Sequence, residues 1–194
     1  MPTPVKLSHV VFKTFQLNAM RDWYCAVLNA RVVFERPGIA CFITYDDEHH
    51  RLAFAQISGD APTNVPLHPG VQHVGFTFST AKEVLTQYCI LRDRGIVPSV
   101  NVNHGPTLSM YYTDPDGNMA ELLVDRFATG KEADDFMKSE AYRTNSFGIE
   151  FDPEDLVKKM AAGATEAQLL KYDEDRLNRN YAETIKDVKR KMGM

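Results

Sequence analysis

Apolar and polar positions run through the same succession of periods twice along this chain. Alternation with a period of two residues, typical of a strand with one buried face, begins near Leu7 and again near Val71. Each alternating stretch is followed by apolar residues at helical spacing. The first helix is predicted over residues 18–28, and Gly95 ends the second. Three further strands are predicted in each copy, at residues 31–35, 40–45 and 51–57, and at residues 97–101, 108–113 and 119–124.

A constant offset of 64 residues relates the two copies, since Leu7-Ser-His9-Val falls on Val71-Gln-His73-Val. One βαβββ unit cannot bury its sheet alone. We therefore predict an α+β fold in which paired βαβββ modules form one incomplete mixed β-barrel. The modules span about 5–58 and 70–125 within a domain of residues 1–126, and residues 127–194 form a helical C-terminal extension.

The extension carries its own helix signals. Asp152-Pro153 is typical of a helix start, Gly163 of a helix end, and Thr165-Glu-Ala-Gln168 of a capping box. The aromatic segment 147–151 packs on the core or edges a pocket. A last apolar stripe faces either the protein's own core or another subunit; it consists of Leu177, Tyr181, Ile185, Val188 and Met192.

Composition narrows the functional classes. The chain has 194 residues, 44% of them hydrophobic, and a net charge of −4 with both signs interspersed, so we expect no nucleic acid partner. It has neither a basic-then-apolar leader pattern nor an apolar run near the roughly 18 residues that span a bilayer, so we expect no membrane association. Three cysteines without CxxC spacing indicate reduced thiols, and hence a cytoplasmic protein.

Glu121 is the first candidate for chemistry. Asp114-Pro-Asp-Gly117 predicts a tight turn, and Glu121 lies in the middle of the apolar strand that returns from it. A carboxylate in such a strand is costly to bury without a partner charge or a metal. The alternative is that Glu121 faces water from an edge strand.

Two histidines change this balance. His9 and His73 occupy equivalent places in the repeat, early in the first strand of each module. A single histidine on an apolar strand is more often a core residue, but two equivalent ones with a downstream carboxylate indicate a metal. His9, His73 and Glu121 would make a facial triad, the ligand set typical of non-haem Fe(II) oxygen chemistry. Mn(II) suits the same ligands, and Zn(II) remains open.

With these motifs the sequence resembles the vicinal oxygen chelate superfamily, and within it the one-domain extradiol catechol dioxygenases similar to dihydroxybiphenyl dioxygenases. The resemblance covers residues 7–124. It rests on Leu-Ser-His9-Val, on Gln-His73-Val-Gly-Phe, and on His104-Gly followed by Tyr111-Tyr-Thr-Asp-Pro-Asp-Gly-Asn-Met-Ala-Glu121-Leu. The segment Glu48-His-His-Arg-Leu-Ala-Phe-Ala is similar to the strand that carries the catalytic base in ring-cleaving members.

The resemblance implies roles for single residues. His9, His73 and Glu121 would hold iron, and His50 would be the acid/base. His104 would donate to substrate or oxygen from behind the metal ligands, and Tyr111 would hydrogen-bond the substrate hydroxyl. The alternative for His50 is an exposed turn histidine. His49 is expected to point the opposite way along the strand, and His68 is left unassigned.

The function so implied is Fe(II)-dependent extradiol cleavage of the aromatic ring of a catechol, a substituted one, in aromatic catabolism. The partners would be the catechol and O2, and we expect a homo-oligomer. Glyoxalase-type members take a fourth ligand from the last strand of the first module, where this chain offers only Gln56. The alternatives are another metal-dependent enzyme of the superfamily (isomerase, lyase or thiol transferase) and a non-catalytic protein that binds aromatic compounds or confers resistance.

Overall fold

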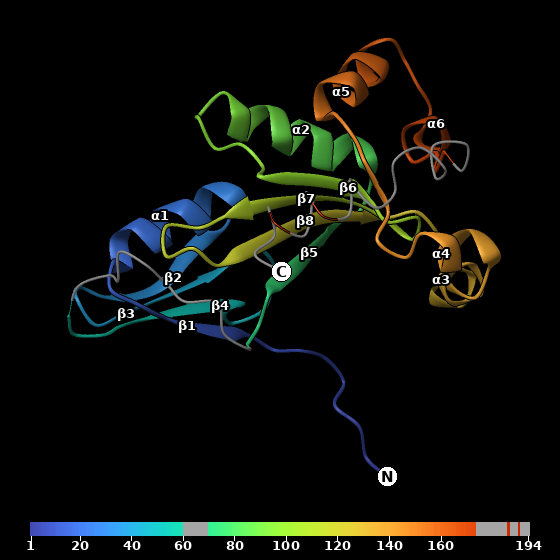
Figure 1. The fold of residues 1–194 in the computed structure, drawn as a ribbon. Coiled ribbons are helices and arrows are strands. Elements are labelled where there is room, and N and C mark those ends of the chain that lie inside the picture. The colour runs from blue at the N-terminus through green and yellow to red at the C-terminus, as the bar shows by residue number, and fades with distance from the viewer. Residues whose placement is uncertain (60–69, 174–185, 187–189, 191–194) are drawn as a thin grey trace. The chain divides into compact units, whose positions relative to one another are not determined.

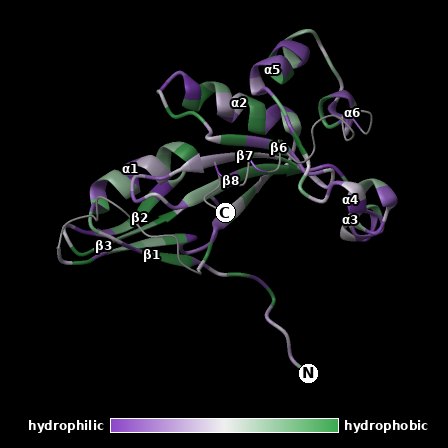
Figure 2. Ribbon diagram, in the orientation of Figure 1, coloured by the Kyte–Doolittle hydropathy of each residue, from purple (hydrophilic) through white to green (hydrophobic). Residues whose placement is uncertain are grey.

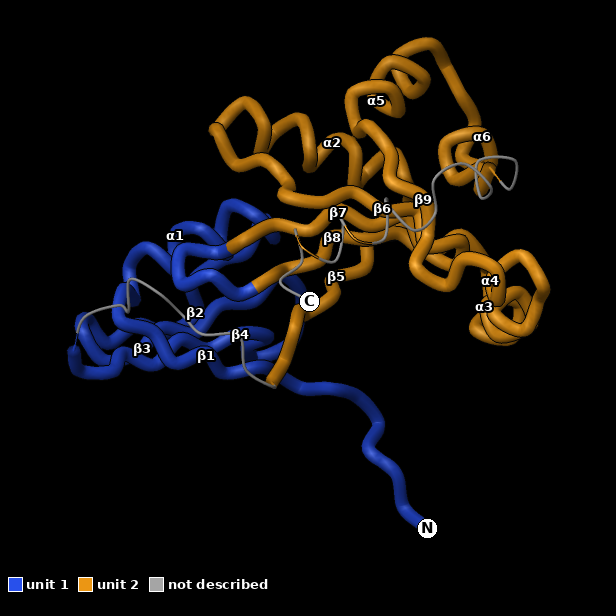
Figure 3. The backbone as a smooth tube through the Cα atoms, in the orientation of Figure 1, with its two compact units in different colours: residues 1–68, 114–118 blue, residues 69–113, 119–194 orange. Residues whose placement is uncertain are grey.

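The computed structural model describes residues 1–59 and 70–173 and the single positions 186 and 190. It divides into two compact units, one of residues 1–68 and 114–118 and one of residues 69–113 and 119–194 (Figure 3). Each unit is built on one βαβββ module, so the predicted α+β class and its repeat are confirmed. Closure of the two modules into one barrel and the boundary at residue 126 stay predictions. His68 and the apolar stripe from Leu177 to Met192 lie outside the described residues.

The first unit is a four-stranded sheet with one helix (Figure 1). Its strands follow the order β1-β4-β3-β2, with β1 and β4 parallel and the other neighbours antiparallel. In chain order the elements are β1 (Val10–Thr14), α1 (Leu17–Val27), β2 (Arg31–Arg36), β3 (Ala40–Thr44) and β4 (Leu52–Gln56).

The second unit repeats this plan and adds to it. Its sheet has the order β5-β8-β7-β6-β9, with β5 and β8 parallel. The module consists of β5 (His73–Phe78), α2 (Ala81–Arg92), β6 (Val100–Asn103), β7 (Thr107–Thr113) and β8 (Met119–Asp125). After it come α3 (Gly130–Met137), α4 (Glu140–Thr144), β9 (Ile149–Glu150), α5 (Pro153–Ala161) and α6 (Glu166–Leu169). The short strand β9 was not predicted; it pairs antiparallel with β6 and so makes the extension part of the sheet.

In each sheet one face lies under the helix of its own module. On α1 the buried Tyr24 packs against the rings of Phe12 and Phe54, at centroid distances of 5.4 and 5.3 Å. On α2 the buried face that covers the second sheet includes Val84, Leu85 and Leu91. The helices alternate hydrophobic and hydrophilic residues along the ribbon, as one-sided packing requires (Figure 2). Because side chains alternate along a strand, His73, Tyr111 and Glu121 lie on the face of the second sheet away from α2.

The turn at residues 114–118 is organised by one buried carboxylate. Asp114 is 4% exposed and accepts hydrogen bonds from the backbone N–H groups of Asp116 and Asn118, at 2.9 and 2.8 Å. Its other oxygen accepts from the Asn118 amide at 2.9 Å and from the Tyr24 hydroxyl at 3.1 Å. Gly117 closes the turn with φ +87°, a conformation in which glycine is unstrained. The predicted turn is confirmed, and its carboxylate also ties it to α1.

Some boundaries differ from the sequence prediction. The first strands begin at Val10 and His73 instead of Leu7 and Val71, and β6 begins at Val100 because Pro98 cannot donate a backbone hydrogen bond. The helix signals of the extension are confirmed. Asp152 caps α5 with Pro153 at its start, and Thr165 and Gln168 form a capping box on α6. Within the described residues, no helix combines the length and the apolar character that a bilayer span requires.

The Asp114 cluster yields a stability prediction. Tyr24→Phe removes one donor and should lower the free energy of unfolding by about 1 kcal/mol. Asp114→Ala should cost roughly 3 kcal/mol or more, because it leaves two backbone N–H groups and a buried hydroxyl without an acceptor. Urea denaturation of both variants measures the difference. Equal losses for the two variants would contradict the central role of the carboxylate.

Candidate active site

Glu121 is a buried carboxylate in the interior of the five-stranded sheet. It lies on β8, between β5 and β7, and is 6% exposed, so the alternative of a water-facing edge residue is wrong. Burial by itself raises the pKa of this carboxyl. Hydrogen bonds from His73, Ser109 and Tyr111 outweigh that effect and hold the pKa below its usual range. Glu121 is therefore an anion inside the protein at neutral pH.

His73 meets this anion from the neighbouring strand. Its Nε2 lies 3.0 Å from Glu121 Oε2, and its Nδ1 is hydrogen-bonded to the side-chain oxygen of Gln72. That oxygen can only accept, so Nδ1 donates to it, while Nε2 donates to Glu121 in the metal-free protein. A metal would bind Nε2 in place of that proton. Two ligands at right angles on one ion, with bonds of roughly 2.1 Å, lie about 3 Å apart. His73 and Glu121 therefore fit a divalent ion as neighbouring ligands.

Gly75, which was not predicted as a site residue, makes room for this pair. It lies opposite Glu121 in the parallel ladder, on the same face as His73. A Cβ at this position would come 3.1 Å from Glu121 Oε2 and 3.2 Å from Leu123 Cδ2. The glycine thus keeps space beside the oxygen that faces His73.

Tyr111 and His104 extend the polar group along the sheet. The buried Tyr111 hydroxyl donates to the second oxygen of Glu121 at 2.7 Å and lies 2.8 Å from Nε2 of His104. Burial, followed by the charge of Glu121, raises the pKa of Tyr111, so the hydroxyl keeps its proton. Burial also lowers the pKa of His104 and favours a neutral imidazole, against the charge of Glu121. The structure thus brings together four residues that the sequence predicted as site residues.

His9, His49 and His50 form a second group, in the first unit. The ring of His50 lies between those of His9 and Phe42, at centroid distances of 4.4 and 4.9 Å. Burial, followed by the nearby His9 and His49, lowers the pKa of His50, so it is neutral at pH 7. It is half-buried, more enclosed than the exposed turn residue of the alternative.

The expectation that His49 points away from His50 is wrong. Their Nδ1 atoms lie 2.6 Å apart, one donating to the other. Side chains do not alternate here, because both residues precede β4, which begins at Leu52, and lie in the bend after β3. Arg51 stabilises this bend through ion pairs with Asp46 and Glu48.

The strand registers show where the two modules correspond and where they differ. Val11 pairs with Ala53 on β4 as Gly75 pairs with Glu121 on β8, so His9 and His73 each lie two residues before the equivalent position. Ala53 therefore occupies the position in the first module that Glu121 occupies in the second, and it is not a carboxylate. Phe42 opposite Ala53 corresponds to Tyr111 opposite Glu121.

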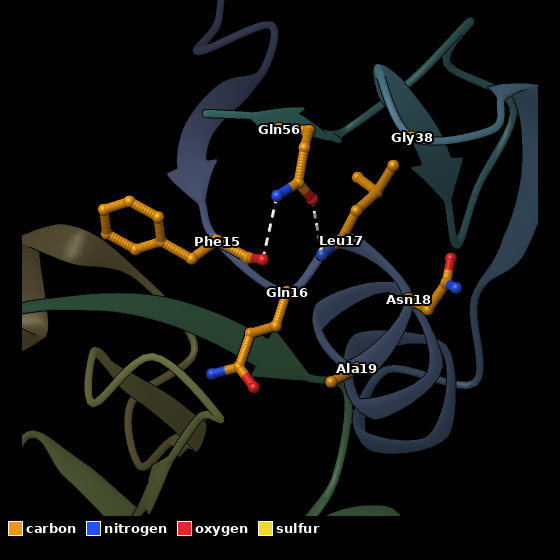
Figure 4. A pocket seen from close by; sticks show the side chains of 7 residues that line it. All are labelled: Phe15, Gln16, Leu17, Asn18, Ala19, Gly38 and Gln56. Atoms are coloured by element: carbon orange, nitrogen blue, oxygen red, sulfur yellow. Dashed lines mark hydrogen bonds between the residues drawn. The ribbon is translucent and has the colours of Figure 1, made fainter. Parts of the chain in front are cut away.

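Gln56 is engaged in hydrogen bonds to the backbone at the start of α1, so it is not placed as a metal ligand. Its amide nitrogen donates to the backbone carbonyl of Phe15 at 2.8 Å, and its oxygen accepts from the backbone N–H of Leu17 at 3.0 Å (Figure 4). It lines a pocket of about 380 Å³ at the start of α1, together with Phe15, Gln16, Leu17, Asn18, Ala19 and Gly38. This pocket lies at the far end of β1 and β4 from His9 and His50, so it belongs to neither histidine group.

The three predicted metal ligands thus belong to two groups of side chains, one in each unit. In the part of the chain that the structure describes, no three His, Cys, Asp or Glu side chains gather as a ligand set. His73 and Glu121 meet in one unit, and His9 lies beside His50 in the other. That His9 joins the pair stays a prediction.

Residues 6–122 match the model of a protein family described as the Glyoxalase/Bleomycin resistance protein/Dioxygenase superfamily. The chain belongs to this superfamily. Two curated members from Rhodococcus globerulus extend the similarity into the region after the match. Biphenyl-2,3-diol 1,2-dioxygenase 3 is 46% identical over 87% of this chain and 89% of its own length. For biphenyl-2,3-diol 1,2-dioxygenase 2 the values are 44%, 84% and 85%.

A solved superfamily structure shares the fold. It is the glyoxylase/bleomycin resistance protein/dioxygenase domain from Frankia sp. EAN1pec, with a TM-score of 0.55 at 14% identity over 68% of this chain and 99% of that one. At this identity the likeness shows the fold alone, and it agrees with the two βαβββ modules described above.

Gly75 offers a test of the His73–Glu121 pair. In Gly75→Ala the new methyl group should push Glu121 Oε2 away from His73 and weaken divalent-metal binding roughly tenfold, as changes next to metal ligands do. Gly130→Ala is the matched control, because a Cβ there meets nothing within 4 Å. Isothermal titration with Mn(II) measures both. Unchanged affinity in Gly75→Ala would mean that Glu121 does not bind the ion from this position.

Proposed function

We propose that this protein is an extradiol ring-cleaving dioxygenase that acts on a catechol, a biphenyl-type diol being the first candidate. The observation that carries the proposal is the buried Glu121 carboxylate, paired with His73 and hydrogen-bonded through Tyr111 to His104. Two relatives named as biphenyl-2,3-diol 1,2-dioxygenases, at 46% and 44% identity over most of the chain, support the same reaction.

The metal would be Fe(II), held by His73 and Glu121 with His9 as the third ligand; Mn(II) would suit the same donors. Two imidazoles and one carboxylate on one face of an ion leave adjacent positions open, the arrangement used by Fe(II) oxygenases. When bound, the ion lowers the pKa of coordinated hydroxyl groups and supplies the redox chemistry with O2.

The chain's own residues would hold the substrate and move protons. Tyr111 presents its hydroxyl beside Glu121, where it can hydrogen-bond a catechol oxygen next to the metal. His50, neutral at pH 7, can accept a proton from the second catechol hydroxyl and later return it. His104 lies behind Tyr111 and sets the direction of the Tyr111 hydroxyl. Phe42, stacked on His50, keeps that ring in place.

Two other functions would use the same fold. Another metal-dependent enzyme of the superfamily would need the same pair but no base at residue 50. A non-catalytic binding protein would need no buried carboxylate, and Glu121 therefore argues against it. We further propose a cytoplasmic homo-oligomer without nucleic acid or membrane partners. The three free cysteines support the reducing compartment.

The deciding experiment is reconstitution. The protein is loaded with Fe(II) without air and then mixed with O2 and a series of catechols, including 2,3-dihydroxybiphenyl. Coloured ring-opened product should form, and a chelator should abolish it. Glu121→Gln should lose both iron and turnover, because the amide is neutral and a poorer ligand. No product from any catechol with iron bound would leave only the other functions.

His50→Gln tests the proton-transfer role. Iron content and catechol affinity should stay within about twofold, since His50 is not a proposed ligand, while turnover falls by roughly 10²-fold or more. His49→Gln is the comparison, because its side-chain oxygen can still accept from His50 Nδ1 and leave Nε2 free to take a proton, and it should keep most of the turnover. Iron analysis, catechol titration without O2 and steady-state rates give the three readouts. Parental turnover in His50→Gln would remove His50 from the mechanism.

A further inference from the structure

A turn of the C-terminal extension comes into direct contact with the candidate active site. Residues 145–148 lie between α4 and β9, and β9 pairs with β6 so that Asn103 is opposite Ile149. Gly148 has φ +106°, and a Cβ there would come 2.4 Å from the carbonyl oxygen of Asn103. Only a glycine lets this turn approach the backbone next to His104 so closely.

Asn145 holds the shape of the turn. Its side chain is 4% exposed and makes three hydrogen bonds within the turn. Its oxygen accepts from the backbone N–H groups of Phe147 and Gly148, at 3.1 and 2.9 Å, and its amide donates to the carbonyl of Gly148 at 2.7 Å. A side chain that replaces backbone partners in this way fixes the direction of the peptide groups around it.

The peptide group so fixed meets His104. The carbonyl oxygen of Phe147 lies 2.5 Å from Nδ1 of His104, while Nε2 on the other side of the ring lies 2.8 Å from the Tyr111 hydroxyl. A carbonyl oxygen can only accept, so Nδ1 must carry a proton. In a neutral imidazole this leaves Nε2 as an acceptor facing Tyr111.

We propose that residues 145–148 are a positioning device that sets the tautomer of His104, and that Asn145 is its positioning residue. Through His104 the turn decides which way the Tyr111 hydroxyl can donate. The hydroxyl has one proton and two acceptors, Glu121 Oε1 and His104 Nε2. If the proton moved from Nδ1 to Nε2, Nε2 would become a donor and Tyr111 could no longer turn away from Glu121.

A neighbouring contact from the extension supports this role. A Cβ on Gly105, which has φ +93°, would come 2.4 Å from the ring of Phe136 on α3. Arg126 lies over the rings of Phe127 and Phe136, at 5.1 and 5.2 Å from their centroids. The residue that follows His104 is thus packed by the extension, so the extension holds His104 both through its ring and through its backbone.

The test is ring-nitrogen NMR on the full chain without metal, with ¹⁵N-labelled histidine and the His104 signals assigned by their loss in His104→Gln. The parent protein should show a proton on Nδ1 of His104. In Asn145→Ala this population should fall in favour of the Nε2-protonated form. The iron-loaded variant should keep its iron content while kcat falls roughly tenfold. Thr165→Ala, which removes the exposed cap of α6 in the same extension, should change neither the signal nor kcat.

Each result decides the proposal. A parent protein with its proton on Nε2 of His104 would overturn it. So would an Asn145→Ala variant that loses turnover with an unchanged His104 signal, because Asn145 would then be merely structural. If Asn145→Ala does not fold, Asn145→Ser, whose hydroxyl still accepts more weakly, takes its place. The kinetic part rests on the proposed function. An Nδ1-protonated His104 in a protein that cleaves no catechol would refute that function and leave the positioning role intact.

Discussion

The structure of the second unit depends on keeping one carboxylate charged inside a sheet. Glu121 is nearly inaccessible, and a buried anion without partners would cost far more than a strand gains from packing. The sheet meets this requirement from both neighbouring strands, with His73 on β5 and Tyr111 on β7. Gly75 is part of the same solution because it leaves room for the oxygen that faces His73. His73, Tyr111 and Gly75 thus allow Glu121 to be buried as an anion.

The same environment separates the tasks of the histidines. His50 and His104 are both held neutral by burial, but their ring nitrogens have different partners. His104 has a carbonyl on one side and a hydroxyl on the other, so its orientation is fixed. His50 is held mainly through its ring faces, between His9 and Phe42, and its Nε2 is the nitrogen away from the contact with His49. A group that must accept and return a proton needs such an uncommitted nitrogen, whereas a group that orients another residue does not.

The sequence predicts what is local or repeated and misses what depends on distant backbone. Local side-chain chemistry predicts the turn at Asp114 and the helix caps at Asp152 and Thr165, and the repeat predicts the two modules. The structure confirms all of these. The pairing of β9 with β6 joins residues far apart in the chain, and two residues of strand leave no periodicity to detect. The Phe147 carbonyl belongs to a backbone group that every residue has, so no residue type announces its contact with His104. The prediction for His49 was wrong for a different reason, because strand alternation was assumed for a residue that lies in a bend.

The difference between the modules at one register position bears on which chemistry the fold supports. Ala53 is the counterpart of Glu121, and Gln56, the remaining polar side chain of β4, is engaged with the start of α1. An ion held as proposed would then have three protein ligands and a single negative charge. In the proposed pairing of the modules around one ion, a second carboxylate at residue 53 would occupy a coordination position and add a charge, leaving less room for two substrate oxygens and O2. The small residue on β4 therefore favours oxygen chemistry over the reactions of members that take a fourth ligand from this strand. The asymmetry between two otherwise repeated modules therefore supports the proposed reaction.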